Sequence, residues 1–132
     1  MKAYFYAATI SVATVFFATA TASADDAEAG KKVFAACRAC HQIGEKAKNG
    51  VGPELNGLIG RHSGSVEGYK YSPANKDSGI VWDEETFREY IKNPKATIPG
   101  TKMIYAGLKD EQKISDLIAY LKKFDADGKT HD

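Results

Sequence analysis

Cysteine is scarce in this sequence of 132 residues, which has two, at positions 37 and 40. A structural zinc site takes four ligands, usually from two such pairs. The sequence has no second pair, and its three histidines are not spaced as ligands on one helix. This scarcity therefore argues against a structural zinc site.

A basic excess is also absent, with 18 Lys and Arg residues against 17 Asp and Glu. Nucleic-acid-binding domains usually carry a strong basic excess, so no nucleic-acid partner is expected. Internal repeats and strand-like alternation are absent as well. The length and the 43% hydrophobic content suit one domain without a predicted sheet.

The first 24 residues have the composition of an export signal. They begin with Lys2, continue as an apolar run and end in Ala-Ser-Ala at positions 22–24. We predict a cleaved secretory signal peptide over 1–24, a mature domain over 25–132 and a periplasmic location without stable membrane insertion after cleavage. The absence of arginine argues against a mitochondrial transit peptide, and an uncleaved membrane anchor is the remaining alternative.

Three segments of the mature chain predict helices. The first spans 26–39, with apolar residues at spacings of three and four. The second begins at Asp83 as N-cap and stops at Pro94, which cannot continue the helical hydrogen bonds. The third spans 110–124 and has the strongest apolar stripe. The predicted fold class is all-α.

A long irregular region, 42–82, separates the first two predicted helices. It contains eight of the twelve glycines and predicts at most a short helix at 73–76. Irregular segments of this length are unusual in a compact domain. We therefore expect something other than protein backbone to organise it.

The two cysteines belong to the motif Cys37-Arg-Ala-Cys40-His41. A thioredoxin-like motif would follow a strand in an α/β fold, and no such pattern is present. A short disulfide is the other alternative, but it gives His41 no role. Cys-x-x-Cys-His is the attachment signal for c-type haem, with both cysteines bonded to the porphyrin and the histidine as an axial ligand. We predict one covalently attached haem c.

The second axial ligand is predicted to be Met103, the only methionine outside the signal segment. It lies in a Pro/Gly-containing loop, IPGTKMIYAG, between two predicted helices. His/Met ligation raises the reduction potential and suits electron transfer. The competing ligands are weaker: His62 is expected to face solvent or hydrogen-bond, His131 lies in an expected frayed end, and Lys102 could displace the methionine at high pH.

These motifs make the mature chain similar to the class I cytochromes c, specifically the bacterial cytochrome c2 and mitochondrial cytochrome c group. The resemblance rests on AGKKVFAACRACH, VGPELNGLIGR, SVEGYKYSPANKDSGIVW, YIKNPKATIPGTKMIYAG and DLIAYLKK. It implies the cytochrome c fold, with three main helices and long loops around one haem. It also implies that Gly30 and Phe34 pack on Leu117 and Tyr120 where the first and last helices cross.

The resemblance also implies roles around the haem. The carbonyl of Pro53 would accept a hydrogen bond from His41. The propionates would be bound by Arg61, Tyr71, Ser72 and Trp82. A buried polar network near Met103 would include Asn75, Tyr90 and Thr101. The alternative is that the three aromatic residues are ordinary core residues and that Arg61 lies on the surface.

Members of this family dock redox partners through lysines around the haem edge. The matching positions here are Lys32, Lys48, Lys95, Lys102 and Lys109. Ala36, Gly50 and Asp110 stand where lysines are expected, and Tyr105 stands where phenylalanine is usual. We therefore expect weaker electrostatic steering than in strongly basic members, and solvated lysines without a docking role are the alternative.

The resemblance implies a soluble, monomeric, periplasmic one-electron carrier that is not an enzyme. It would dock transiently with a cytochrome bc1-type quinol-oxidising complex and with an oxidase or a photosynthetic reaction centre. A c-type peroxidase-like or gas-binding protein with an open sixth position is the alternative. A subunit dedicated to one dehydrogenase is a third interpretation.

Overall fold

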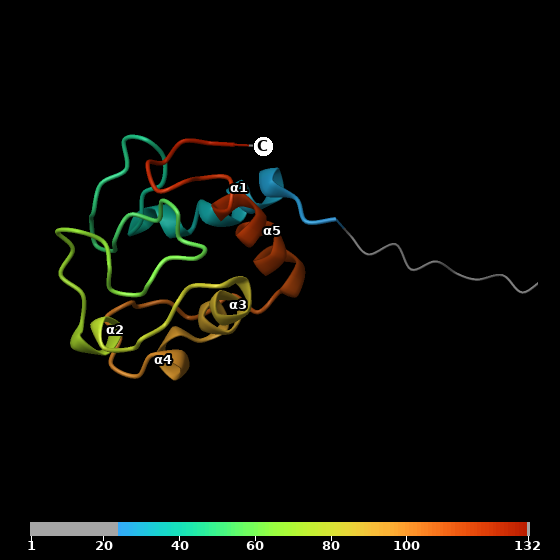
Figure 1. Cartoon of the computed structure of the whole chain (residues 1–132). Helices are drawn as coiled ribbons and strands as arrows, with labels where there is room; N and C mark the ends of the chain where they lie inside the picture. Colours follow the sequence, from blue (N-terminus) through green and yellow to red (C-terminus); the bar gives the residue numbers. More distant parts are fainter. Residues whose placement is uncertain (1–23, 132) are drawn as a thin grey trace, which may run out of the picture.

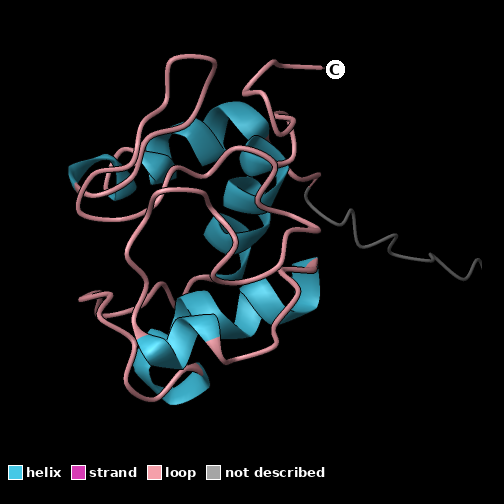
Figure 2. Ribbon diagram, turned by 60° about the vertical axis from the view of Figure 1, so that its left-hand side comes forward, coloured by secondary structure: helices cyan, strands magenta, loops and turns pink. Residues whose placement is uncertain are grey.

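The computed structural model describes residues 24–131 (Figures 1 and 2). The predicted signal peptide, 1–24, lies outside the described residues except for Ala24. Five α-helices and one 3-10 helix occur in the described part: α1 Ala27–Phe34, η1 Cys37–Ala39, α2 Pro73–Lys76, α3 Glu84–Lys92, α4 Pro94–Thr97 and α5 Glu111–Leu121. Within it the only β-type pairings are two isolated bridges, His62 with Val81 and Phe124 with Thr130. The all-α prediction is confirmed.

Helices α1 and α5 cross at close range, as expected (Figure 1). A Cβ atom at Gly30 would lie 1.9 Å from the carbonyl oxygen of Asp116 and 2.9 Å from the Cβ of Tyr120. The rings of Phe34 and Tyr120 lie with their centroids 5.4 Å apart. The absence of a side chain at Gly30 thus permits the crossing, which buries Phe34 and Leu117.

The first helix is shorter than the 26–39 predicted. Helix α1 ends at Phe34 because the next amides turn to carbonyls three residues back: Ala35 N bonds Lys32 O and Ala36 N bonds Val33 O, both at 3.3 Å. The chain then forms η1, where the amides of Cys40 and His41 share the carbonyl of Cys37 at 3.1 and 2.9 Å. This tighter winding brings the two cysteines and His41 to one cavity.

The second helix begins where predicted. The carboxylate of Asp83 accepts a hydrogen bond from the amide of Thr86 at 2.7 Å, and α3 ends at Lys92 before Pro94. Pro94 also begins the short helix α4, which the sequence did not predict, with the Asn93 side chain accepting from Ala96 N at 3.3 Å. A proline fits the first turn of a helix because its missing N–H would have no partner there.

The third helix ends at Leu121, three residues before the predicted limit. After it, the carboxylate of Asp125 accepts from the amides of Asp127 and Lys129, each at 2.9 Å, and so folds the chain into a turn. The carbonyl of Phe124 accepts from Gly57 N at 3.2 Å. Thr130 forms an isolated bridge with Phe124, and His131 N donates to Lys123 O at 3.0 Å. The exposed C-terminal residues up to His131 are therefore hydrogen-bonded to the rest of the chain, and the expectation of a frayed end was wrong.

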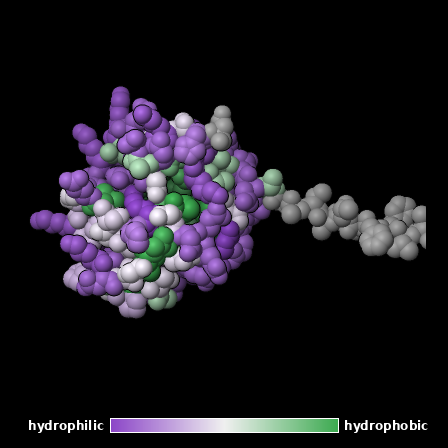
Figure 3. Space-filling model, in the orientation of Figure 1, coloured by the Kyte–Doolittle hydropathy of each residue, from purple (hydrophilic) through white to green (hydrophobic). Residues whose placement is uncertain are grey.

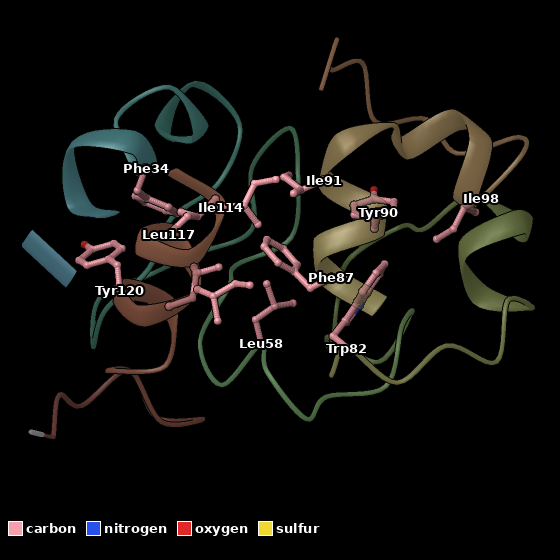
Figure 4. Close-up of a cluster of buried hydrophobic side chains, with 12 residues drawn as sticks. Phe34, Leu58, Trp82, Phe87, Tyr90, Ile91, Ile98, Ile114, Leu117 and Tyr120 are labelled. Atoms are coloured by element: carbon pink, nitrogen blue, oxygen red, sulfur yellow. The ribbon is translucent and has the colours of Figure 1, made fainter. Parts of the chain in front are cut away.

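The hydrophobic core lies between the α1–α5 pair and α3 (Figure 4). Phe34, Ile114, Leu117 and Tyr120 come from the first pair, and Phe87, Tyr90 and Ile91 come from α3. Leu58 and Trp82 join them from the irregular region. None of the helices formed by residues 24–131 is long and apolar enough to cross a membrane.

The irregular region 42–82 contains α2 at the predicted position and is otherwise held by side chains. The buried amide of Asn56 accepts from Gly44 N at 2.8 Å and donates to Gly44 O at 3.0 Å. These bonds close the loop that carries residues 44–56. One side of the region faces a large cavity.

Candidate functional site

A cavity of about 460 Å³ opens between the core helices and the irregular loops. Its volume lies in the range of ligand-binding pockets. Large apolar side chains dominate its wall, namely Phe34, Leu55, Leu58, Phe87, Ile91, Leu117 and Leu121. Val51 and Ile104 also line it and are 75% and 92% exposed. Figure 3 shows a face on which hydrophobic side chains gather near the centre, within hydrophilic surroundings.

Cys37, Cys40 and His41 line this cavity together. Cys37 is half-buried and Cys40 is exposed, and both thiols are free. Burial raises the pKa of the Cys37 thiol, and neighbouring Cys40 adds to the effect. The disulfide alternative is therefore not the state of this structure, which presents two thiols to one apolar cavity.

His41 is held in a defined orientation. Its Nδ1 atom lies 2.7 Å from the carbonyl oxygen of Pro53, which cannot donate. Nδ1 therefore carries the proton, and Nε2 keeps the lone pair that a metal needs. Burial lowers the pKa of His41, the Pro53 hydrogen bond opposes this, and the charge of Arg61 lowers it further. The lowered pKa favours the neutral imidazole, the form that could bind a metal through Nε2.

Arg61 stands at another part of the wall. Its guanidinium donates to the carbonyls of Asn56 at 2.8 Å and Glu54 at 3.1 Å, and lies 3.6 Å from the Glu54 carboxylate. Its buried Nε atom has no hydrogen-bond partner among the described residues. Burial lowers the pKa of Arg61, while Glu54 and Tyr71 raise it. A half-buried cation with a buried spare donor is suited to an anionic group in the cavity.

The other predicted propionate ligands also line the cavity. Tyr71 accepts from Val66 N at 3.1 Å, and burial is the main cause of its raised pKa. Ser72 caps α2 and hydrogen-bonds Asn75 Oδ1 at 3.1 Å. Trp82 is buried, with its ring centroid 4.7 Å from that of Tyr90. The structure thus gathers Arg61, Tyr71, Ser72 and Trp82 around one cavity.

Met103 lines the cavity as well, in the loop that connects α4 and α5. The hydroxyl of Tyr90 donates to Met103 Sδ at 3.0 Å, and Met103 N donates to Thr101 Oγ1 at 3.3 Å. Burial raises the pKa of Tyr90, and a hydrogen bond with Thr101 opposes this. Tyr90 and Thr101 therefore both hydrogen-bond Met103, as the predicted polar network requires. The Asn75 side chain hydrogen-bonds Ser72 and not this group.

These features fit a covalently bound haem. The apolar cavity is lined by two thiols, an oriented imidazole, a thioether sulfur and a half-buried arginine with a spare donor. His62 and His131 are exposed and do not line the cavity. Within residues 24–131, no three His, Cys, Asp or Glu residues cluster as a separate metal site.

The five predicted docking lysines are all exposed, and Lys102 also lines the cavity. The ammonium groups of Lys102 and Lys109 donate to the main-chain carbonyls of Lys70 and Lys92. Over residues 24–131, the side chains of Lys32, Lys48 and Lys95 form no hydrogen bond or ion pair. The predicted docking set thus divides into two anchored and three free side chains.

Three site residues were not predicted from the sequence. Gly52 lies against His41, where a Cβ would be 2.3 Å from Cε1 of the imidazole. Glu54 pairs with Arg61, and Tyr69 lines the cavity beside Lys102. Gly52 could have been identified from the sequence, because it directly precedes Pro53, the predicted hydrogen-bond partner of His41. Glu54 contacts Arg61 within the irregular region and Tyr69 contacts Lys102 from a distant loop, and no sequence pattern predicted either contact.

Comparisons with known proteins agree with this site. Residues 27–125 match the family model described as cytochrome c. The chain is 68% identical over 109 residues to cytochrome c2 of Blastochloris viridis, covering 83% of this chain and 86% of that protein. It is 64% identical over 104 residues to cytochrome c-550 of Nitrobacter winogradskyi, covering 79% and 95%. The solved structure of cytochrome cH from Methylobacterium extorquens is similar, with TM-score 0.70 and 47% identity over 74% of this chain and 97% of that one.

Proposed function

This chain belongs to the cytochrome c family and is an electron-transfer protein rather than an enzyme, and we propose that it carries electrons between membrane redox complexes in the periplasm. It binds one haem c, attached through Cys37 and Cys40. When bound, haem c supplies a one-electron Fe(III)/Fe(II) couple. The main support for the proposal is that His41 and Met103 line the same apolar cavity.

In this proposal His41 and Met103 are the two axial ligands. Nε2 of His41 is available because Nδ1 is engaged by Pro53 at 2.7 Å. Met103 is held from inside the core by the Tyr90 hydroxyl. A rigid pair of protein ligands leaves no open position for a substrate, and it keeps the site similar in both oxidation states. This favours electron transfer over the peroxidase-like or gas-binding alternative.

Arg61, Tyr71, Ser72 and Trp82 are proposed to bind the haem propionates. Support comes from the spare Nε donor of Arg61 and from the position of all four in the cavity wall. Asn75 and Thr101 would complete the polar surroundings, Asn75 by orienting Ser72 and Thr101 beside Met103. A propionate paired with Arg61 would be stabilised as an anion within an otherwise apolar site.

The exposed edge of the cavity is the proposed point of electron exit. Val51 and Ile104 provide an apolar contact there, and exposed lysines surround the same region in the family to which the chain belongs. Lys32, Lys48, Lys95, Lys102 and Lys109 would orient a partner during brief encounters. The proposed partners are a cytochrome bc1-type complex as donor and a terminal oxidase or photosynthetic reaction centre as acceptor, with the carrier acting as a monomer.

The periplasmic location rests on the proposed signal peptide, 1–24. Its charged start, apolar run and Ala-Ser-Ala end suit export and cleavage after Ala24. The intact mass of the holoprotein recovered from a periplasmic fraction tests this. A mature chain beginning at Asp25 is expected, whereas a full-length chain recovered with the membranes would contradict it.

Electron-exchange kinetics with two small probes test the docking proposal. We expect Lys48→Gln and Lys95→Gln to slow oxidation by anionic ferricyanide and to speed oxidation by a cationic tris-phenanthroline cobalt(III) complex, most clearly at low salt. Lys113→Gln on α5 changes the net charge equally but is not one of the five proposed docking positions. Equal effects of all three substitutions would show that net charge, and not a local surface, sets the rates.

A further inference from the structure

The loop that carries Met103 has few attachments to the rest of the molecule. From Pro99 to Gly107, the described chain has hydrogen bonds to two distant segments. The Tyr90 hydroxyl donates to Met103 Sδ and also hydrogen-bonds the Thr101 side chain, and Lys102 Nζ donates to the carbonyl of Lys70. The Tyr90 contacts lie at the sulfur that would bind iron and at Thr101 beside it. Lys102 is therefore the polar anchor of this loop that is independent of both Tyr90 and the proposed ligand atom.

Lys102 makes a second contact with the same neighbouring loop. Its ammonium nitrogen lies 4.5 Å from the centroid of the Tyr69 ring. A cation over an aromatic face is attracted by the quadrupole of the ring. One exposed lysine thus holds the Met103 loop to both the main chain and a side chain of residues 69–70.

Tyr69 also contacts a third loop, which contains Val51. Its hydroxyl donates to the carbonyl of Val51 at 2.7 Å, and its ring packs edge-on against Tyr71 at 4.8 Å between centroids. The loop that contains Val51 also carries Pro53, the hydrogen-bond partner of His41. Val51, Tyr69 and Lys102 all line the cavity. The chain of contacts therefore connects the loops on the His41 and Met103 sides of the site.

We propose that Tyr69 and Lys102 form a clamp across the cavity edge that holds the Met103 loop closed, with Tyr69 as a positioning residue for electron transfer. The inference rests on the proposed His41 and Met103 ligation. An external ligand can reach the iron only in the fraction of molecules whose Met103 loop is open. Its apparent affinity scales with that fraction, so a weaker clamp gives tighter binding of the external ligand.

Imidazole titration of the ferric holoprotein measures this open fraction directly. Lys102→Gln removes both Lys102 contacts, and Tyr69→Phe removes the bond to Val51 while keeping the ring. We expect imidazole to bind about tenfold more tightly to the first variant and about two- to fivefold more tightly to the second. Lys102→Arg keeps the cation and its donors, and should restore nearly wild-type binding.

Lys70→Gln is the matched control. It removes one exposed positive charge next to Tyr69 but leaves the Lys70 carbonyl in place, and so should not change imidazole binding. The double variant Lys102→Gln/Tyr69→Phe should gain less than the product of the two single effects, because the two residues act in one chain of contacts. Wild-type affinity in Lys102→Gln, or an equal gain in Lys70→Gln, would overturn the clamp.

Met103→Ala separates failure of the clamp from failure of the proposed ligation. Tight imidazole binding by Met103→Ala, beside clamp variants that bind like the wild type, would overturn the clamp alone. Equal imidazole binding by the wild type and Met103→Ala would overturn the proposed ligation and the clamp together.

Discussion

At the scale of single residues, the orientation of His41 depends on the missing side chain of Gly52. A Cβ at Gly52 would lie 2.3 Å from Cε1 of the imidazole and 2.6 Å from Nδ1. The imidazole could accommodate a methyl group only by leaving the Pro53 carbonyl. Gly52 therefore helps to fix the orientation of His41, the proposed axial ligand, by leaving room for its imidazole.

We predict that Gly52→Ala lowers the yield of holoprotein and the free energy of unfolding by about 1–3 kcal/mol, the usual cost of overpacking. Gly50→Ala in the same loop is the control, since its Cβ would meet only Cys40 O at an ordinary 3.5 Å. Haem content and denaturant unfolding of the two variants make the comparison. Similar results for both would contradict the role assigned to Gly52.

Tyr90 acts on Met103 through one hydrogen bond of 3.0 Å to the sulfur. A donated hydrogen bond withdraws electron density from sulfur and makes it a weaker donor to ferric iron. Its loss in Tyr90→Phe should stabilise the ferric state and lower the midpoint potential by about 20–60 mV. Spectroelectrochemistry measures this.

Tyr120→Phe is the control for Tyr90→Phe, because Tyr120 packs between α1 and α5 and lies outside the cavity wall. Its midpoint potential should stay at the wild-type value. An unchanged potential in Tyr90→Phe, or an equal fall in Tyr120→Phe, would show that the Tyr90 hydroxyl does not act on the ligand.

At the scale of elements, the crossing of α1 and α5 sets the base of the cavity. Phe34 and Leu117 belong to both the core and the cavity wall. The crossing distance depends on Gly30, whose position leaves no space for a Cβ next to the Asp116 carbonyl. Because that obstacle is backbone, a side chain at Gly30 would have to push the helices apart.

Gly30→Ala is predicted to lower the free energy of unfolding by about 2–3 kcal/mol. Helix propensity alone would give the opposite sign, a gain of about 1 kcal/mol. The paired variant Ala29→Gly, at a half-buried position of α1, should lose only about 1 kcal/mol. Denaturant unfolding of both variants decides the point, and a stabilised Gly30→Ala would refute the close crossing.

Helix ends set by local side chains could be predicted from the sequence, and those set by tertiary contacts could not. Asp83 and Asp110 cap α3 and α5 as expected, through bonds to amides three residues on. The end of α1 gave no local signal, because Ala35 and Ala36 are good helix formers. The chain leaves the helix there to bring the Cys37 and Cys40 thiols to the cavity.

At the scale of the whole molecule, the site also combines residues that the sequence predicts with contacts that only the tertiary structure shows. Cys37, Cys40 and His41 are adjacent in sequence, and Met103 was found because no other methionine lies outside the signal segment. The pairing of Arg61 with Glu54 forms within the irregular region, and the clamp of Tyr69 and Lys102 joins two separate loops. Periodicity and capping carry no information about such contacts, so the structure was needed to find them.

The central claim is that His41 and Met103 close both axial positions of a haem that carries electrons. A visible-region redox titration of the exported holoprotein, with carbon monoxide added to the reduced form, tests it most directly. We expect a low-spin c-type spectrum, a positive midpoint potential and no carbon monoxide binding. A high-spin spectrum or ready carbon monoxide binding would show that Met103 does not hold the iron, and the proposed electron-carrier function would then be wrong.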